Sequence, residues 1–238
     1  MPDGNELSER RSLLWKSKTN HKDFPFVHIV YEKTGEREKM DMPAWIVARR
    51  LVDPMIDVYY PEITGIESKQ IERRLNERIK RQVERMIRKQ LSEDAAKTTI
   101  TGIFEIKNNQ RNIVSLLNSH YSYSGGAHGI TIQRSLTMNV KTGEIYSLKD
   151  VFKANAPYVK RLDQIIEKQI EARQLDLLGD YPGIHPNQYF YIADKALVIY
   201  FQLYELLPYV YGFPYFVISV YELEDIVKED GPLGVMMY

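Results

Sequence analysis

A glycine-rich turn with one histidine is the segment of this sequence with the clearest chemical potential. Residues 121–129 read Tyr-Ser-Tyr-Ser-Gly-Gly-Ala-His-Gly and lie between two segments with the composition of β-strands. The glycines allow backbone angles that side chains forbid. The backbone N–H groups of these glycines could point at an anion. Alternatively, the glycines could simply form a wide hairpin corner. The corner is the simpler interpretation. The binding hypothesis places five residues at a contact surface: Tyr121, Tyr123, Gly125, Gly126 and His128.

Tyrosines supply the second group of candidate residues. Nine of them fall between Tyr181 and Tyr221. Tyrosine combines a large rigid contact area with a polar tip, so loops rich in it often form protein or sugar contact surfaces. It also fills half-buried sheet faces. We expect contact in the loop 203–214 and packing in the strands beside it. The loop adds four candidate binding residues: Tyr204, Glu205, Tyr209 and Tyr211.

The histidines are the alternative starting point, because they could support catalysis. None of the five stands at a metal-ligand spacing such as H-x-x-x-H, and no serine lies in a G-x-S-x-G elbow. His120 and His128 could meet across the corner if their strands pair there. A hydrolase or metal-dependent enzyme centred on these two residues is therefore the alternative function. The leading interpretation assigns no catalytic residue, no metal and no cofactor.

Composition limits the class of partner. The chain of 238 residues has 32 Lys+Arg and 32 Asp+Glu, so no overall field draws it to nucleic acid. It has no cysteine, which excludes disulfides and thiolate chemistry. No segment approaches the ~20 apolar residues of a membrane helix. Residues 1–20 lack the apolar stretch of a signal peptide, so the sequence by itself reads as cytoplasmic.

The clearest regular element is a helix over residues 67–91, with Ser68 as a plausible cap. Its other face holds nine Lys/Arg against four Glu, and we expect most of this face to be solvated. A second alternative function is a cytosolic scaffold that captures a partner through this helix and the 1–22 arm, with Arg74, Arg78, Arg81 and Arg85 as contacts. The apolar stripe of the helix recurs every three or four positions: Ile71, Leu75, Ile79, Val83, Met86, Ile87 and Leu91.

The order of elements predicts the fold class. A second helix begins near Pro157, and hairpin-length turns separate most of the strand candidates. This order predicts an α+β fold, an antiparallel β-sheet with two long amphipathic helices packed on one face. We expect a flexible N-terminal arm over 1–22, an α+β region over 23–107 and a second α+β domain over 108–230, together forming one compact unit. The later predicted strands are 98–107, 111–123, 130–140, 188–193, 196–202 and 215–220.

An ordered set of motifs resembles two known families. Several segments resemble the C-terminal domain of the RsiV-like family. They are Tyr121-x-Tyr123-x-Gly125-Gly126-Ala127-His128-Gly129, Asn139-Val140-x-Thr142-Gly143-Glu144, Leu148-x-Asp150-Val151-Phe152, Phe190-Tyr191-x-x-Asp194-Lys195 and Tyr204-Glu205-x-x-Pro208-Tyr209. Upstream, Tyr60-Pro61-x-Ile63-x-Gly65 leading into an amphipathic helix resembles the PdaC-type domain that precedes it in such proteins.

The resemblance implies an α+β fold that is usually displayed outside the cytoplasm of Gram-positive bacteria. In anti-sigma-factor members of the family it implies an ectodomain that senses lysozyme. This sequence shows neither a membrane helix nor an obvious sigma-binding segment, and it lacks the separate catalytic domain of PdaC-type deacetylases. Of the functions that the resemblance implies, we therefore expect this chain to have only that of a sensing or binding module. Its expected partner is a protein or cell-wall ligand, such as an envelope component or a lysozyme-like protein.

Overall fold

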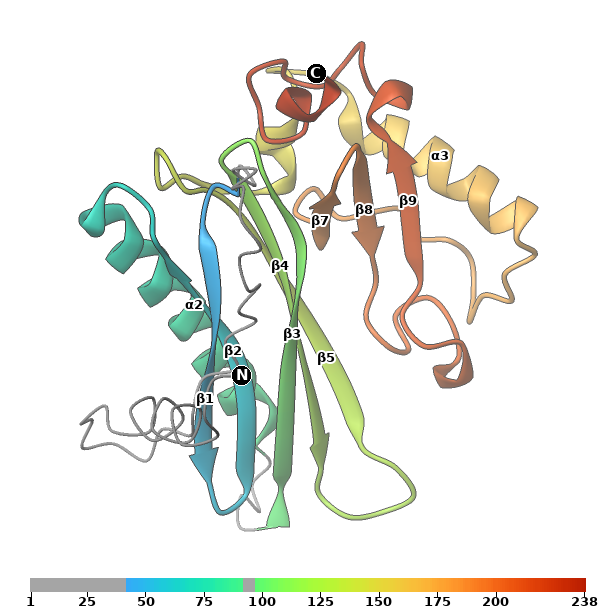
Figure 1. Ribbon diagram of the computed structural model, residues 1–238. Coiled ribbons are helices and arrows are strands. Elements are labelled where there is room, and N and C mark those ends of the chain that lie inside the picture. The colour runs from blue at the N-terminus through green and yellow to red at the C-terminus, as the bar shows by residue number, and fades with distance from the viewer. Residues whose placement is uncertain (1–41, 92–96) are drawn as a thin grey trace, which may run out of the picture.

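The computed structural model describes residues 42–91 and 97–238, which form two β-sheets. The larger sheet has the strand order β1-β2-β3-β4-β5-β6, and the smaller has the order β7-β8-β9. Figure 1 shows helix α2 along the larger sheet and helix α3 along the smaller one. The predicted arm 1–22 and the first part of the predicted 23–107 region, up to residue 41, lie outside the described residues.

Most of the larger sheet is antiparallel, but one pair of its strands is not. β2 and β3 run parallel where Ile56–Val58 pair with Ile100–Gly102. Two consecutive left-handed residues, Arg111 and Asn112, form the turn between β3 and β4. The gap at 108–110 between the predicted strands 98–107 and 111–123 is therefore not the turn, because β3 continues to Gln110 past a register shift at 106–108. The strands are β1 (Trp45–Asp53), β2 (Ile56–Thr64), β3 (Thr99–Gln110), β4 (Ile113–Tyr123), β5 (Ile130–Asn139) and β6 (Ile145–Tyr146).

Helix α2 (Lys69–Gln90) confirms the prediction from apolar periodicity. The hydroxyl oxygen of Ser68 accepts a hydrogen bond from the backbone N–H of Ile71 at 3.3 Å, so Ser68 is the N-cap. The apolar stripe packs onto the larger sheet, where Leu75 and Ile79 share a core with Leu116, Leu136 and Met138. The basic face points away from that core, as the charge pattern predicted.

The second sheet has its own helix and its own core. Helix α3 (Tyr158–Ala172) buries Leu162 and Ile166 against Phe216 and Ile218 of the small sheet. The strands are β7 (Phe190–Ala193), β8 (Ala196–Tyr200) and β9 (Tyr215–Ser219). Short 3₁₀ segments complete this part of the chain: η2 (Leu148–Val151), η3 (Tyr209–Tyr211), η4 (Val220–Glu222) and η5 (Gly234–Met237).

The fold is therefore mixed α+β, and the predicted placement of two helices on one face of one sheet is not confirmed. Each helix covers a different sheet, and α3 is 15 residues long against 22 for α2. An apolar stripe shows that a helix face is buried, but it does not specify which sheet covers that face. The predicted boundary between residues 107 and 108 falls inside β3, so the division into domains stays a prediction.

A polar seam on β4 lies under α2. The Gln82 side-chain oxygen accepts a hydrogen bond from the Asn118 amide at 3.0 Å, and the Gln90 amide donates to the backbone oxygen of His120 at 2.9 Å. The His120 side chain is fully buried beside Gly102, where an added Cβ would lie 2.8 Å from the imidazole. Burial without a hydrogen-bond partner among the described residues lowers the pKa of His120 from 6.5 to about 4.

This buried imidazole predicts a pH dependence of stability. Between pH 6.5 and about 4 the unfolded chain binds a proton at His120 and the folded chain does not. The contribution of the neutral His120 side chain to the free energy of unfolding is therefore fully present above pH 6.5, and it is lost as the pH falls to about 4. The shift corresponds to a loss of about 3 kcal/mol in the free energy of unfolding. Urea unfolding across this range should show a shallower pH slope for His120→Gln than for the wild type. Parallel slopes would contradict the assignment.

Candidate functional site

The structure brings together the two segments that the sequence singled out. The turn after β4 and the loop between β8 and β9 meet in a cluster that we call the aromatic corner: Tyr121, His128, Tyr204 and Tyr209. The His128 ring stacks on the Tyr209 ring with centroids 4.5 Å apart and planes at 23°. The Tyr204 and Tyr209 rings lie 5.5 Å apart. The Tyr209 hydroxyl donates to the backbone oxygen of Gly129 at 3.4 Å, which joins the two segments directly.

Glycines shape the first half of the corner. Gly125 and Gly126 have φ values of +95° and +98°, a region that side chains rarely adopt. Gly129 is needed for a different reason, because an added Cβ would lie 2.2 Å from the Ser122 carbonyl oxygen and 2.4 Å from the Tyr121 ring. Its N–H donates to the Tyr121 hydroxyl at 3.2 Å. The turn is therefore a packed structural corner that also presents its tyrosines.

The second half of the corner is a loop braced by its own polar groups. A carboxylate oxygen of Glu205 accepts a hydrogen bond from the Gln202 N–H at 2.7 Å. The side chain of Gln202 bonds in turn to both backbone groups of Gln133 on β5, at 3.0 and 3.2 Å. Sequence reasoning missed Gln202 and Gln133, because a glutamine near a strand end carries no pattern that distinguishes it. The hydrogen bonds between Gln202 and Gln133 hold the loop between β8 and β9 against the larger sheet.

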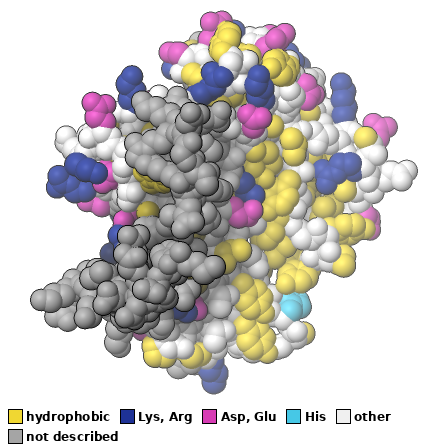
Figure 2. Space-filling view, in the orientation of Figure 1, with side chains coloured by type: hydrophobic (Ala, Val, Ile, Leu, Met, Phe, Trp, Pro, Cys, Tyr) yellow, Lys and Arg dark blue, Asp and Glu magenta, His cyan; other side chains and the backbone are white. Residues whose placement is uncertain are grey.

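The corner presents apolar surface to solvent. Tyr204 is 48% exposed and Tyr211 is 52% exposed, and the neighbouring Val210 is 85% exposed. Tyr121 and Tyr123 are also exposed, and the Tyr123 hydroxyl donates to the backbone oxygen of Gly126 at 3.0 Å. Figure 2 shows hydrophobic side chains in a broken band down one face of the molecule, with a histidine near its lower end. Large exposed aromatic side chains on braced loops are typical of contact surfaces.

The structure does not bring the two histidines of the enzyme hypothesis together. His120 is buried under α2 with its ring beside Gly102, whereas His128 lies at the exposed corner against Tyr209. Across residues 42–91 and 97–238, no hydrogen bond or ring contact joins them. In the same ranges no cluster of three or more His, Cys, Asp or Glu side chains could hold a metal ion. His21 and His28 lie outside the described residues.

The four arginines of the scaffold hypothesis have separate environments. Arg74 donates to the backbone oxygen of Gly143, and Arg81 lies 3.8 Å from the carboxylate of Glu77. Arg78 and Arg85 instead line a groove of about 430 Å³ beside β5. The helix therefore does not present these arginines as one continuous patch.

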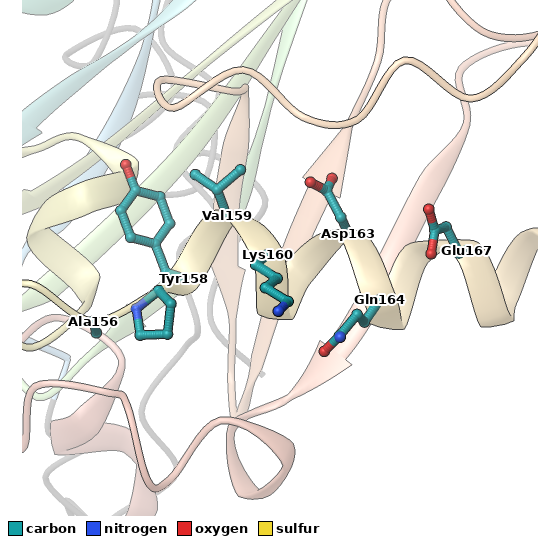
Figure 3. A pocket seen from close by; sticks show the side chains of 8 residues that line it. Ala156, Tyr158, Val159, Lys160, Asp163, Gln164 and Glu167 are labelled. Atoms are coloured by element: carbon teal, nitrogen blue, oxygen red, sulfur yellow. The ribbon is translucent and has the colours of Figure 1, made fainter.

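A further hollow of about 540 Å³ lies along the first half of α3 (Figure 3). The carboxylate of Asp163 there already accepts hydrogen bonds from the Tyr181 hydroxyl and the Ile184 N–H, both at 2.8 Å. The Tyr158 hydroxyl donates to the backbone oxygen of Pro186 at 3.0 Å. These contacts connect α3 to the 179–187 loop, so two of the polar side chains at this hollow have structural roles.

Two family models match the chain in succession. The model described as "Deacetylase PdaC" covers residues 53–131, and the model described as "Protein of unknown function (DUF3298)" covers residues 149–221. The peptidoglycan-N-acetylmuramic acid deacetylase PdaC of Bacillus subtilis is 25% identical over 134 residues, which cover 53% of this chain and 28% of that protein. The anti-sigma-V factor RsiV of the same organism is 27% identical over 177 residues, which cover 64% of this chain and 58% of that protein. The chain thus spans less than two thirds of either relative.

Two crystal structures share the fold. A DUF3298 family protein from Pseudomonas aeruginosa superposes with a TM-score of 0.60 at 16% identity and covers 79% of this chain and 94% of its own. A DUF3298 family member from Bacteroides fragilis superposes with a TM-score of 0.57 at 15% identity, and the match covers 82% of this chain and 95% of the Bacteroides chain. In the part of the chain that the structure describes, no helix has the length and apolar character to cross a membrane. The family matches and the RsiV relative show that the chain combines a PdaC-type match with a following DUF3298-type match, in agreement with the RsiV-like motifs found in its sequence.

Proposed function

We propose that this chain is a non-enzymatic binding or sensing module and that the aromatic corner is its contact surface. The observation that carries the proposal is the convergence of the 121–130 turn with the 203–214 loop. The distant PdaC and RsiV relatives and the DUF3298 fold fit a sensing or binding module. The corner supplies the surface that such a module needs, since its exposed tyrosines lie at the end of β4 and on a loop that hydrogen bonds hold in place.

The physical reason for choosing this surface is preorganisation. Binding is weakened when side chains and loops must be ordered at the interface. Here the stacking of His128 on Tyr209 and the bond from Tyr209 to Gly129 restrain these groups before any ligand arrives. Buried or half-buried aromatic anchors commonly dominate interface energetics. We therefore assign the main contact energy to Tyr204, Tyr209 and His128, with Tyr121, Tyr123 and Tyr211 around them.

The chemistry of the corner suits a protein surface or a sugar chain. Tyrosine faces pack against apolar and sugar surfaces, and their hydroxyl groups supply hydrogen bonds. One relative is named for an action on peptidoglycan N-acetylmuramic acid, and the other is named as an anti-sigma factor. We propose a cell-wall fragment or a lysozyme-like protein as the ligand of this chain. The turn lies in the region matched by the PdaC model and the loop lies in the region matched by the DUF3298 model, so both regions contribute to the proposed surface.

The test is a titration of the whole chain with soluble peptidoglycan fragments and, separately, with hen egg-white lysozyme. We expect one of these probes to bind, and we expect Tyr209→Ala to weaken that binding by about tenfold or more, or roughly 1.4 kcal/mol. Tyr204→Ala and His128→Ala should each weaken it by a smaller factor, since each removes one side of the same stack. Isothermal titration calorimetry measures all three changes.

Tyr221→Ala is the matched control, since Tyr221 is 54% exposed but belongs to η4, outside both segments of the corner. Its affinity should equal that of the wild type. Equal losses in Tyr209→Ala and Tyr221→Ala would show that the corner is not the surface. Binding to neither probe would reject both proposed ligands. Turnover of peptidoglycan fragments that disappears in a folded His128→Ala protein would instead support the hydrolase hypothesis.

Gly129→Ala tests whether the corner is preorganised. The added methyl group would overlap the Ser122 carbonyl and the Tyr121 ring, so we expect a loss of about 1–3 kcal/mol in stability. Gly179→Ala is the control, because an added Cβ there meets no atom within 4 Å. Thermal unfolding should separate the two variants, and ligand affinity should fall only in Gly129→Ala. An unchanged melting temperature in Gly129→Ala would contradict the packing described.

A further inference from the structure

A basic groove between α2 and the edge of β5 is a feature that the aromatic corner does not use. It encloses about 430 Å³. β6 pairs only with Thr137 and Met138, and within the described residues no strand pairs with the earlier part of that β5 edge. The groove follows this edge. Its cations are Arg78, Arg85 and Lys89 from α2 and Arg134 from β5, and no acidic side chain lines it.

The three cations of α2 form a row along one face of the helix. Their spacings of seven and four residues correspond to whole turns, so they lie above one another over roughly 16 Å. The acidic residues of the helix pair elsewhere, since Glu77 lies 3.8 Å from Arg81 and Glu84 lies 4.0 Å from Arg88. Within the described ranges, no carboxylate lies within ion-pair distance of the four groove cations. Among residues 42–91 and 97–238, the groove is therefore a row of positive charge without a carboxylate partner.

Arg134 completes the groove from the opposite wall. Its guanidinium carbon lies 4.3 Å from the centre of the Tyr189 ring, and Nη1 donates to the backbone oxygen of Gln133 at 2.5 Å. Tyr189 comes from the segment just before β7, and its ring also stacks on Tyr200 with centroids 5.6 Å apart. The stacked ring thus positions a cation that faces α2. This arrangement explains why an arginine interrupts the otherwise apolar face of β5.

The cations in the groove repel one another. Burial lowers the pKa of Arg78, and the nearby charges of Arg85 and Arg81 lower it further. Like charges gathered in a partly enclosed site destabilise the folded chain unless an anion joins them. A bound anion would relieve this repulsion, and guanidinium groups match phosphate oxygens with paired hydrogen bonds.

We propose that the basic groove binds a linear chain of phosphate groups. A row of cations favours a ligand with repeated negative charges over a single small ion, because each phosphate group can face a different cation. A nucleic acid fits less well, because the ring of Tyr189 already packs against Arg134 and Tyr200 and leaves little surface for a stacked base. Inorganic polyphosphate and a poly(glycerol phosphate) share the required chemistry.

The experiment titrates the whole chain with short linear polyphosphate, poly(glycerol phosphate), orthophosphate and a single-stranded oligonucleotide of equal charge, in about 50 mM salt. We expect one of the two phosphate polymers to bind at least about tenfold more tightly than orthophosphate and than the oligonucleotide. The preferred polymer identifies the source of the phosphate chain. Arg85→Gln, on an exposed helix position, should weaken that binding by about fivefold to tenfold. Arg78→Gln should do the same.

Arg88→Gln is the matched control, because it removes the same charge from the same helix outside the groove. Its affinity should change by less than about twofold. Equal losses in all three variants, equal binding of the oligonucleotide, or no binding in low salt would overturn the proposal. This site is independent of the aromatic corner. His128→Ala should leave polyphosphate affinity unchanged, so the two proposals fail separately.

Discussion

The contact between strand β7 and the larger sheet is the interaction on which both candidate sites depend. β7 is an edge strand, and its free backbone groups would be unsatisfied inside the protein. Two serines of the larger sheet supply partners: the Ile192 N–H donates to the Ser115 hydroxyl at 3.1 Å, and the Ser135 hydroxyl donates to the Phe190 carbonyl at 2.5 Å. Leu117 of the larger sheet shares a buried cluster with Tyr191 and Tyr200 of the smaller sheet. Hydrogen bonding sets the register, and apolar burial holds the two sheets together.

Because β7 contacts the larger sheet, each candidate site contains residues from the regions of both sheets. The aromatic corner combines a turn of the larger sheet with a loop of the smaller one. The hydrogen bonds between the Gln202 side chain and the Gln133 backbone connect the two segments. The basic groove combines α2 and β5 with Tyr189, which precedes β7. The corner also spans the two family matches, because His128 lies in the PdaC-type region and Tyr209 lies in the DUF3298-type region. Neither region by itself contains the stacked pair.

Local sequence patterns predicted much of the secondary structure and most residues of the corner. The apolar spacing and Ser68 predicted α2 to within two residues. Glycine content and loop tyrosines pointed to His128 and Tyr209, because left-handed turns and exposed aromatic side chains leave local signals. Their role as binding residues stays a prediction. Gln133 and Gln202, which hold the loop in place, left no local signal in the sequence because these two hydrogen-bonded residues are 69 residues apart.

The sequence by itself determined the mixed α+β class, the buried face of α2 and the absence of cysteine chemistry. Only the tertiary structure decided that α2 and α3 cover different sheets, that β2 and β3 run parallel, and that His120 lies buried away from His128. It also decided that the Arg134 guanidinium packs on the ring of Tyr189, which is 55 residues away in the sequence. The physical reason is that periodicity records whether a side chain is buried. What buries it depends on contacts between segments far apart in the chain.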